Sequence, residues 1–414
     1  MNQIYINITK KLVFLILVTA TLLQVACKKE GSSGAGKDKG APTIKGLRAI
    51  SPKPNDSTLH VAGPGQYVVI RGTNLAYTKA IYFNGYQATF NAALFSDTTM
   101  VVQIPADMPF ASLDQAKLNT IEVVTTSGDV VFKFPIVPPP PIISAMSNES
   151  AVAGTSVTIY GNNFFYIDKV VFPGGITASS GIVSNTSGTT LTVTVPSGVT
   201  TGGTIQVVNR YGTGTSVLLF NDFITGVLLN YDNVNNFAWG AASSNSSTAY
   251  PGNRGTYGVM SASAVGASDL GWWNGNRSIN TNSAQWVSSA NLSSSVDTYA
   301  LKFEISVTKA WSGGSIYIVK DYDWTYLAVY NPWKNADGTV TNFTTNGWLT
   351  VTIPLSSFKT KANNLDGTGD SAPSLSKLLG SGSGGINFMF VNNGTTAVSS
   401  FEAAIDNIRI EKVK

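Results

Sequence analysis

Apolar and polar residues alternate in short runs along most of the 414-residue chain, and Gly, Asn, Ser or Pro separates one run from the next. In runs such as 190–196 and 349–355 every second residue is apolar, the pattern of a strand with one buried face. Many short strands closed by turn residues are typical of β-sandwiches. Charged residues make up only 12% of the chain, which also disfavours a helical protein. We therefore predict an all-β protein.

The segment from residue 41 to 222 contains an internal repeat. Residues 65–75 align with residues 154–164 without a gap, and in both copies a strand pattern runs into Gly-x-Asn followed by an apolar residue. This pattern resembles the IPT/TIG type of immunoglobulin-like domain, whose members often act as spacers or dimerisation units. A run of four prolines, residues 138–141, is a semi-rigid spacer between the copies. We predict two immunoglobulin-like domains in tandem, 41–137 and 138–222.

From about Phe223 the composition shifts towards Trp, Tyr, Asn and Ser. Alternating or apolar runs predict strands at 226–229, 299–307, 315–319, 327–330, 348–354, 385–391 and 401–410. About 190 residues of this kind suit one two-sheet jelly roll. We predict that residues 223–414 form this third domain.

All eight tryptophans lie in the third domain, and several of them stand among turn residues. Loops run over the surface, and an exposed indole is a flat apolar platform with one N–H donor, which suits a sugar ring. Strand patterns around Trp286 and Trp348 assign these two to the core, and Trp239 stays unassigned. Because Trp272 and Trp273 are adjacent, they would face opposite ways on a strand, so one of them would be exposed.

The preferred platform is a predicted hairpin from Asp323 to Lys334. Trp324 and Tyr326 have the spacing i, i+2, which would place them on one face of a strand. Trp333 lies at the end of the same hairpin, and Trp311 stands at the mouth of a turn. With Trp272 or Trp273, these rings form the predicted binding surface. Polar partners for ligand hydroxyls are expected at Asn274, Arg277, Lys320, Asp321, Asp323 and Lys334.

Several motifs of the third domain together resemble a known family. They are Asn230-Tyr231-Asp232, Trp311-Ser312-Gly313-Gly314, Asn331-Pro332-Trp333, the run 346–355 and Ile405-Asp406-Asn407-Ile408. With the tandem spacers they resemble the surface glycan-binding proteins of Bacteroidota polysaccharide-utilisation systems, in the B-type, xyloglucan-binding-like group. The resemblance implies a non-catalytic outer-membrane protein that captures a plant-type glycan of the β-glucan or xyloglucan class. It also implies two partners, a TonB-dependent transporter complex and a surface glycanase.

The N-terminus carries a targeting segment, residues 1–26. Lys10 and Lys11 precede an apolar run that is too short for a comfortable membrane span. The run leads to Cys27, the only cysteine, in a placement that resembles a bacterial lipoprotein signal with a lipidated cysteine. Residues 27–40 are rich in Gly, Ser and Lys and predict a flexible tether. We expect a lipid-anchored protein of the outer membrane that faces the cell exterior.

Two other functions remain open at this stage. A glycoside hydrolase needs two carboxylates across the scissile bond, and the third domain supplies Glu304, Asp321, Asp323 and Asp337. The same aromatic surface could instead hold a protein partner, as in an adhesin. The sole histidine, His60, lies in the first repeat, so chemistry based on a histidine-activated nucleophile is not expected.

No cofactor is expected. A structural calcium ion could lie between Asp232 and Asp406, but it would need several more oxygen ligands than these two residues supply. A zinc site would need several nitrogen and sulfur ligands, whereas the chain has one histidine, His60, and one cysteine, Cys27, which is expected to be lipidated. No basic stripe predicts nucleic-acid binding.

Overall fold

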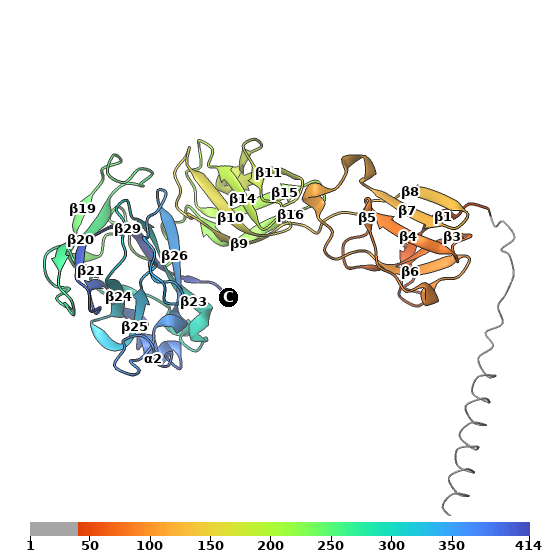
Figure 1. The fold of residues 1–414 in the computed structure, drawn as a ribbon. Coiled ribbons are helices and arrows are strands. Elements are labelled where there is room, and N and C mark those ends of the chain that lie inside the picture. The colour runs from red at the N-terminus through yellow and green to blue at the C-terminus, as the bar shows by residue number, and fades with distance from the viewer. Residues whose placement is uncertain (1–39) are drawn as a thin grey trace, which may run out of the picture. The chain divides into compact units, whose positions relative to one another are not determined.

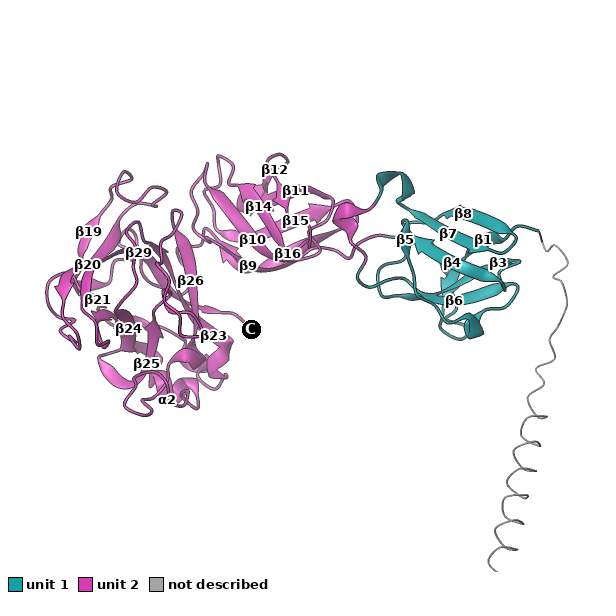
Figure 2. Cartoon of the chain, viewed as in Figure 1, with its two compact units in different colours: residues 1–107, 114–136 teal, residues 108–113, 137–414 magenta. Residues whose placement is uncertain are grey.

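The computed structural model describes residues 40–414. The predicted signal segment, Cys27 and residues 28–39 of the predicted tether lie outside the described residues. The chain divides into two compact units, one of residues up to 107 and 114–136, the other of residues 108–113 and 137–414 (Figure 2). Across residues 40–414, none of the helices is both long and apolar enough to cross a membrane.

The smaller unit is a sandwich of two four-stranded antiparallel sheets. One sheet has the order β2-β1-β3-β6, with β1 (Thr43–Ala49), β2 (Thr58–Leu59), β3 (Tyr67–Thr73) and β6 (Thr99–Gln103). The other has the order β5-β4-β7-β8, with β4 (Thr78–Phe83), β5 (Tyr86–Gln87), β7 (Thr120–Thr125) and β8 (Gly128–Lys133). Short 3-10 turns interrupt the connections at η1 (Ala92–Leu94) and η3 (Gln115–Lys117), whereas η2 (Phe110–Ser112) lies in residues 108–113, which belong to the larger unit.

The repeated Gly-x-Asn motif has one structural cause in both copies. A Cβ atom on Gly72 would lie 1.8 Å from the carbonyl oxygen of Thr43, so only glycine allows the first strand to approach this closely. Gly161 has the same clearance from the first strand of its own domain. Asn74 and Asn163 then adopt positive φ angles of 59° and 63°, a conformation that asparagine tolerates. The motif therefore marks the end of the equivalent strand in each immunoglobulin-like domain.

The second immunoglobulin-like domain opens the larger unit and has its own core, with fully buried Val157, Ile159 and Phe164. Its first sheet has the order β13-β14-β10-β9, with β9 (Ile142–Met146), β10 (Ser156–Asn162), β13 (Val183–Ser184) and β14 (Thr190–Thr194). Its second has the order β12-β11-β15-β16, with β11 (Ile167–Phe172), β12 (Ile176–Ala178), β15 (Gly203–Asn209) and β16 (Gly212–Phe220), and η4 (Pro173–Gly175) joins β11 to β12.

The C-terminal domain is a two-sheet β-sandwich, which confirms the predicted all-β class (Figure 1). The first sheet has the order β19-β20-β29-β23-β26, with β17 also paired to β29. Its strands are β17 (Val227–Leu229), β19 (Ala242–Ser244), β20 (Tyr257–Val265), β23 (Tyr299–Ser306), β26 (Leu349–Pro354) and β29 (Val398–Lys412). The second sheet has the order β18-β21-β28-β24-β25, with β18 (Phe237–Gly240), β21 (Ser278–Thr281), β24 (Ser315–Lys320), β25 (Asp323–Tyr330) and β28 (Ile386–Val391).

A large apolar core fills the space between these two sheets and includes Trp286 and Trp311. Trp348 is also buried, in a smaller cluster with Tyr250 and Tyr257. The assignment of Trp286 and Trp348 to the interior is therefore confirmed. Smaller elements complete the domain: the pair β22 (Ala284–Gln285) and β27 (Ser383–Gly384), the short helix α2 (Leu375–Leu379), and η5 (Ser289–Asn291), η6 (Val296–Thr298) and η7 (Leu355–Ser357).

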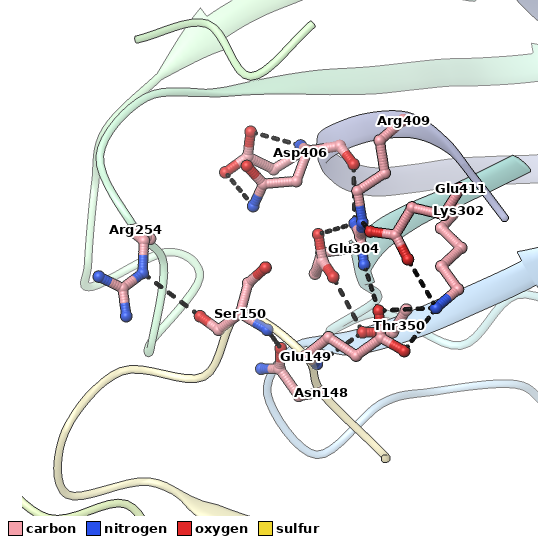
Figure 3. Close-up of polar contacts among 11 residues, drawn as sticks. Asn148, Glu149, Ser150, Arg254, Lys302, Glu304, Thr350, Asp406, Arg409 and Glu411 are labelled. Atoms are coloured by element: carbon pink, nitrogen blue, oxygen red, sulfur yellow. Dashed lines mark hydrogen bonds and ion pairs between the residues drawn. The ribbon is translucent and has the colours of Figure 1, made fainter. Parts of the chain in front are cut away.

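A buried ionic cluster joins the second immunoglobulin-like domain to the C-terminal domain (Figure 3). Glu149, from the loop after β9, binds Lys302 of β23 at 2.7 Å and Arg409 of β29 at 2.7 Å. Arg409 also contacts Glu304 at 2.9 Å and Glu411 at 2.8 Å, and Lys302 contacts Glu411 at 3.0 Å. All five side chains are at least nine-tenths buried. We call these five residues the ionic cluster.

Candidate functional site

An exposed group of aromatic rings lies on the outer side of the second sheet of the C-terminal domain. Trp272 is half-buried, and its ring centroid lies 5.9 Å from Trp239, 5.6 Å from Trp273 and 5.8 Å from Tyr322. The outer three are 41%, 59% and 42% exposed. Trp324 is 42% exposed and contacts Tyr317. Tyr317 belongs to a small apolar cluster on the outer side of this sheet, and Trp272 packs against the same cluster. We call Trp239, Trp272, Trp273, Tyr322 and Trp324 the aromatic surface.

Both edges of the second sheet contribute side chains to the aromatic surface, and each edge contains a β-bulge. Phe237 packs on the core, and regular alternation would send Trp239 to the same side, but the β18–β21 register shifts between them. A bulge inserts an extra residue and turns the following side chains to the other face. On the opposite edge, the register of β24 with β25 shifts between Ile318 and Lys320.

This second bulge corrects the predicted platform. Tyr326 packs against the core between the sheets, whereas Trp324 contacts Tyr317 in the outer cluster. The expectation that Trp324 and Tyr326 share a face is therefore wrong, because the bulge interrupts the alternation on which it rested. Trp324 stays on the exposed side, and Tyr326 supports the sheet from within.

Tyr322 stands at a strained turn. Asp321 and Tyr322 join β24 to β25 and have positive φ angles of 50° and 58°. Asn and Gly usually occupy these two positions of a two-residue hairpin turn. The turn is fixed from the neighbouring strand, because the Asp321 carboxylate accepts the amide of Gly385 at 2.6 Å. Asn387 accepts the amide of Tyr322 at 2.9 Å. These contacts hold the Tyr322 ring against Trp272, with an angle of 24° between the ring planes.

Amide side chains connect the two sides of the aromatic surface beneath the rings. Trp239, Asn280 and Asn387 are paired across three neighbouring strands, and both asparagines are fully buried. Asn280 donates to the carbonyl of Trp239 at 3.3 Å, and Asn387 donates to Asn280 at 3.1 Å. Since Asn387 also accepts from Tyr322, a continuous chain of hydrogen bonds joins the backbones of Trp239 and Tyr322. Networks of this kind hold a surface in one conformation before a ligand binds.

Trp272 and Trp273 lie in a loop anchored by a buried arginine. Arg277 is 6% exposed and donates to the Asp269 carboxylate at 2.9 Å and to the Asp269 carbonyl at 3.3 Å. Asp269 also accepts the amide of Gly271, and these bonds hold the pKa of its carboxyl below the usual value. Arg277 was predicted to bind ligand hydroxyls. The structure instead buries its side chain, because the guanidinium is used to fix the loop.

Two other predicted platforms, Trp311 and Trp333, pack in or against the core of the C-terminal domain. Trp311 is 1% exposed and lies among Phe401, Tyr330 and Phe343, and its indole N–H donates to Gly313 at 2.8 Å. A ring without exposed area cannot stack on a ligand, so Trp311 is corrected from a platform to a core residue.

Trp333 is half-buried, packs against the same core and donates its indole N–H to Gly314 at 2.7 Å. Both indole bonds are accepted by the glycines that follow Trp311, Gly313 and Gly314.

The predicted polar partners are distributed unevenly. Lys320 is 14% exposed and pairs with Asp321 at the strained turn, next to the aromatic surface. Asp323 starts β25 and is exposed, and hydrogen bonds from Thr325 hold the pKa of its carboxyl low. Asn274 follows Trp273 directly and is exposed. Lys334 is exposed as well, in the segment after β25.

The acidic residues considered for catalysis or calcium have other roles or positions. Glu304 belongs to the ionic cluster, where burial raises the pKa of its carboxyl and Arg409 opposes that shift. Asp406 is buried, its pKa is raised by that burial, and it accepts the amide of Asn407 at 2.7 Å. Asp232 accepts the amide of Thr256 at 3.0 Å. Among residues 40–414 the acidic, histidine and cysteine side chains form no group of three or more that could hold a metal ion.

Two family models match separate segments of the described chain. Residues 220–412 match the surface glycan-binding protein B xyloglucan binding domain, and residues 47–134 match the IPT/TIG domain. An IPT/TIG domain-containing protein of Bacteroides ovatus is 26% identical over 385 residues, covering 88% of this chain and 73% of that protein.

Two solved structures share the fold. One is the surface glycan-binding protein PbSGBP-B from Prevotella bryantii, with 20% identity, a TM-score of 0.67 and coverage of 91% of this chain and 99% of that chain. The other is SGBP-B from a complex xyloglucan utilization locus in Bacteroides uniformis, with 19% identity, a TM-score of 0.53 and coverage of 90% and 99%.

Proposed function

We propose that the chain, which matches the surface glycan-binding protein B xyloglucan binding domain over residues 220–412 and an IPT/TIG domain over residues 47–134, captures a plant-type β-glucan or xyloglucan chain at the cell surface. The main chain of the glycan lies on the aromatic surface, and each stacked ring supplies apolar contact to one face of a sugar. Immunoglobulin-like domains hold this surface away from the membrane.

The chain of ring contacts from Trp239 through Trp272 to Tyr322 carries this proposal. Its successive ring centroids are 5.9 Å and 5.8 Å apart, so the strip from Trp239 to Tyr322 is at most about 12 Å long. A strip of this length suits an extended polymer better than a single monosaccharide. Exposed aromatic groups of this size on a soluble domain usually mark a binding site.

Binding without catalysis fits the surroundings of the carboxylates. A glycosidase needs two carboxyl groups facing its substrate. Glu304 faces Arg409 in the ionic cluster, at the junction with the second immunoglobulin-like domain rather than on the aromatic surface. The relatives with solved structures are also named as glycan-binding proteins.

The N-terminal sequence supports anchoring at the outer membrane through a lipidated Cys27, with the binding domain facing the exterior. The captured glycan would then pass to a surface glycanase and a TonB-dependent transporter complex. These partners follow from the family resemblance. An affinity pull-down from solubilised membranes, with the lipidated protein as bait, tests them.

Affinity electrophoresis followed by isothermal titration calorimetry tests the binding itself. The panel contains xyloglucan, mixed-linkage β-glucan, mannan and starch. We expect retardation by xyloglucan or mixed-linkage glucan, and Trp272→Ala should weaken binding about fivefold, since a stacked ring contributes on the order of 1 kcal/mol beyond burial. Tyr67→Ala removes an exposed ring from the N-terminal unit and serves as the matched control. If no polysaccharide retards the wild-type protein, the proposal is wrong.

A further inference from the structure

Trp273 is the most exposed tryptophan of the chain. It is 59% exposed, against 42% for Trp324 and 41% for Trp239, and the other five are half-buried or buried. An indole left in water forgoes the free energy that burial of its apolar area would give. Because this exposed ring belongs to a group of aromatic side chains, it points to contact with a ligand.

The loop that presents Trp273 is tightly built. The carbonyl of Gly271 accepts the amide of Asn274 at 3.1 Å, which closes a short turn around Trp273. A Cβ atom on Gly271 would lie 2.6 Å from Nδ2 of Asn274 and 3.0 Å from Oδ1 of Asp269, so only glycine lets these side chains come so close. Asp269 pairs in turn with the buried Arg277 at 2.9 Å. Packing and hydrogen bonds therefore fix the backbone that carries the ring.

The ring of Trp273 is turned away from the orientation of its neighbours. Trp239 and Tyr322 are inclined by 33° and 24° to Trp272, so each of them roughly follows the plane of Trp272. We call these three rings the strip. Trp273 contacts the middle ring of the strip, Trp272, at 5.6 Å between centroids, and the angle between the two planes is 84°. The aromatic surface thus offers stacking faces in two directions that are almost at right angles.

A straight glucan chain cannot stack in both directions. In a β-1,4-linked main chain the sugar rings lie nearly in the plane of an extended ribbon, so sugars stacked on the strip share one orientation. A sugar stacked on Trp273 must be turned out of that ribbon. Two features of β-glucans turn a sugar in this way, namely a branch on the main chain and a linkage that bends it. Asp269 and Arg277, under the loop, are paired with each other, which favours a neutral sugar over an acidic one.

We propose that Trp273 determines specificity, by selecting β-glucans that turn a neutral sugar out of the main-chain ribbon over straight unbranched chains. The inference rests on the proposed function, because it places the main chain on the strip. A turned sugar is attached to a chain that is already bound, so it meets Trp273 at a high effective concentration. One added stacking contact then raises the affinity about fivefold.

Calorimetry with three probes tests this role. The probes have the same number of main-chain glucose units and are a straight cello-oligosaccharide, a branched xyloglucan oligosaccharide and a bent mixed-linkage oligosaccharide. We expect the wild-type protein to bind at least one of the last two about fivefold more tightly than the straight probe. A preference for the branched probe alone identifies the turned sugar as a branch, and a preference for the bent probe alone identifies it as the sugar at the bend. Trp273→Ala should abolish the preference.

Two further variants separate this role from that of the strip. Trp239→Ala removes one ring of the strip, so it should weaken binding of all three probes by similar factors and keep the preference. Tyr67→Ala, which removes an exposed ring from the N-terminal unit, should behave as wild type. Because the ring of Trp273 is exposed, Trp273→Ala should leave the melting temperature nearly unchanged.

The possible failures are distinguishable. Equal wild-type affinity for the three probes, or a preference for the straight one, overturns the inference and leaves the strip as the binding site. A preference that survives Trp273→Ala also overturns it. Equal weakening of all three probes by Trp273→Ala does so as well, because Trp273 would then contact the main chain. If the wild-type protein binds none of the probes, the proposed function itself fails and this inference fails with it.

Discussion

Removing the ammonium group of Lys302 should destabilise the C-terminal domain by several kcal/mol. In the ionic cluster this group contacts both oxygens of Glu149, at 2.7 and 3.0 Å, and Glu411 at 3.0 Å. Lys302→Met keeps the apolar stem and leaves three carboxylates around one cation. Breaking a buried ion pair costs about 3–5 kcal/mol, because the remaining charge stays buried without compensation. Arg409 still contacts the same carboxylates, so we expect the lower end of that range, about 3 kcal/mol.

Tryptophan fluorescence during urea unfolding measures this change selectively, because all eight tryptophans lie between residues 239 and 348. Glu149→Gln, made in the second immunoglobulin-like domain, should shift the same transition, since it removes charge from the same cluster across the domain junction. The double variant should lose less than the sum of the two single variants, because the residues are in direct contact. This coupling distinguishes an interaction between the domains from local damage.

Lys309→Met is the control, since its pair with Glu402 has side chains that are 64% and 29% exposed, and such pairs contribute only about 0–1 kcal/mol. A loss below about 1 kcal/mol for Lys302→Met would refute the reasoning, as would strict additivity with Glu149→Gln. The prediction concerns single deletions only. Replacing a whole buried cluster by apolar residues of similar volume is often neutral.

Four further outcomes follow from the structure. Trp311→Ala should lower the free energy of unfolding by about 3–5 kcal/mol, seen as a large fall in melting temperature, because it removes a fully buried ring from the core. Arg277→Met should weaken glycan binding several-fold in calorimetry, because it releases the loop of Trp272. Unaltered affinity would show that the loop does not need this anchor. Hydrogen bonds to Asp269 lower the pKa of its carboxyl in the folded protein. The ion pair with Arg277 is therefore fully present above the unfolded pKa of about 3.9 and is lost only as the pH falls through the lower folded pKa. We expect the affinity for glycan to stay constant from about pH 8 to pH 5. Cys27→Ala should release the protein from the membrane fraction of cells and leave the affinity of the purified protein intact.

The fold was predictable where the residues of one short segment determine the backbone conformation of that segment. The repeated Gly-x-Asn motif is such a case, because Gly72 and Gly161 meet the same close approach and the asparagines after them adopt the same positive φ. The strand at 401–410 was predicted, and β29 extends it to residues 398–412. In contrast, β20 escaped prediction, because its Ser and Ala residues lack a strong apolar alternation although β29 pairs with it along almost its whole length.

The ionic cluster had no sequence signal. Glu149 is separated from Lys302 and Arg409 by 153 and 260 positions, and only the packing of two domains brings them together. Glu304 stands at a polar position of an alternating run, and the sequence alone leaves it open as a catalytic carboxylate. Its strand neighbours on the other face fill the core, so Glu304 points to the domain junction.

The aromatic surface was predictable only in part: Trp272, Trp273 and Trp324 belong to the predicted binding surface, whereas Trp239 and Tyr322 do not, because the surface depends on irregular pairing. Alternation predicts which residues share a face only while the register is regular, and bulges shift it at both edges of the second sheet. Trp239 and Trp324 are exposed because of these bulges, and Tyr322 because a strained turn is held by Asn387. A strand with perfect alternation would bury each of these rings or place it beside a different neighbour. The ligand surface is therefore set by contacts between strands far apart in the sequence, and the spacing of tryptophans along the chain does not determine it.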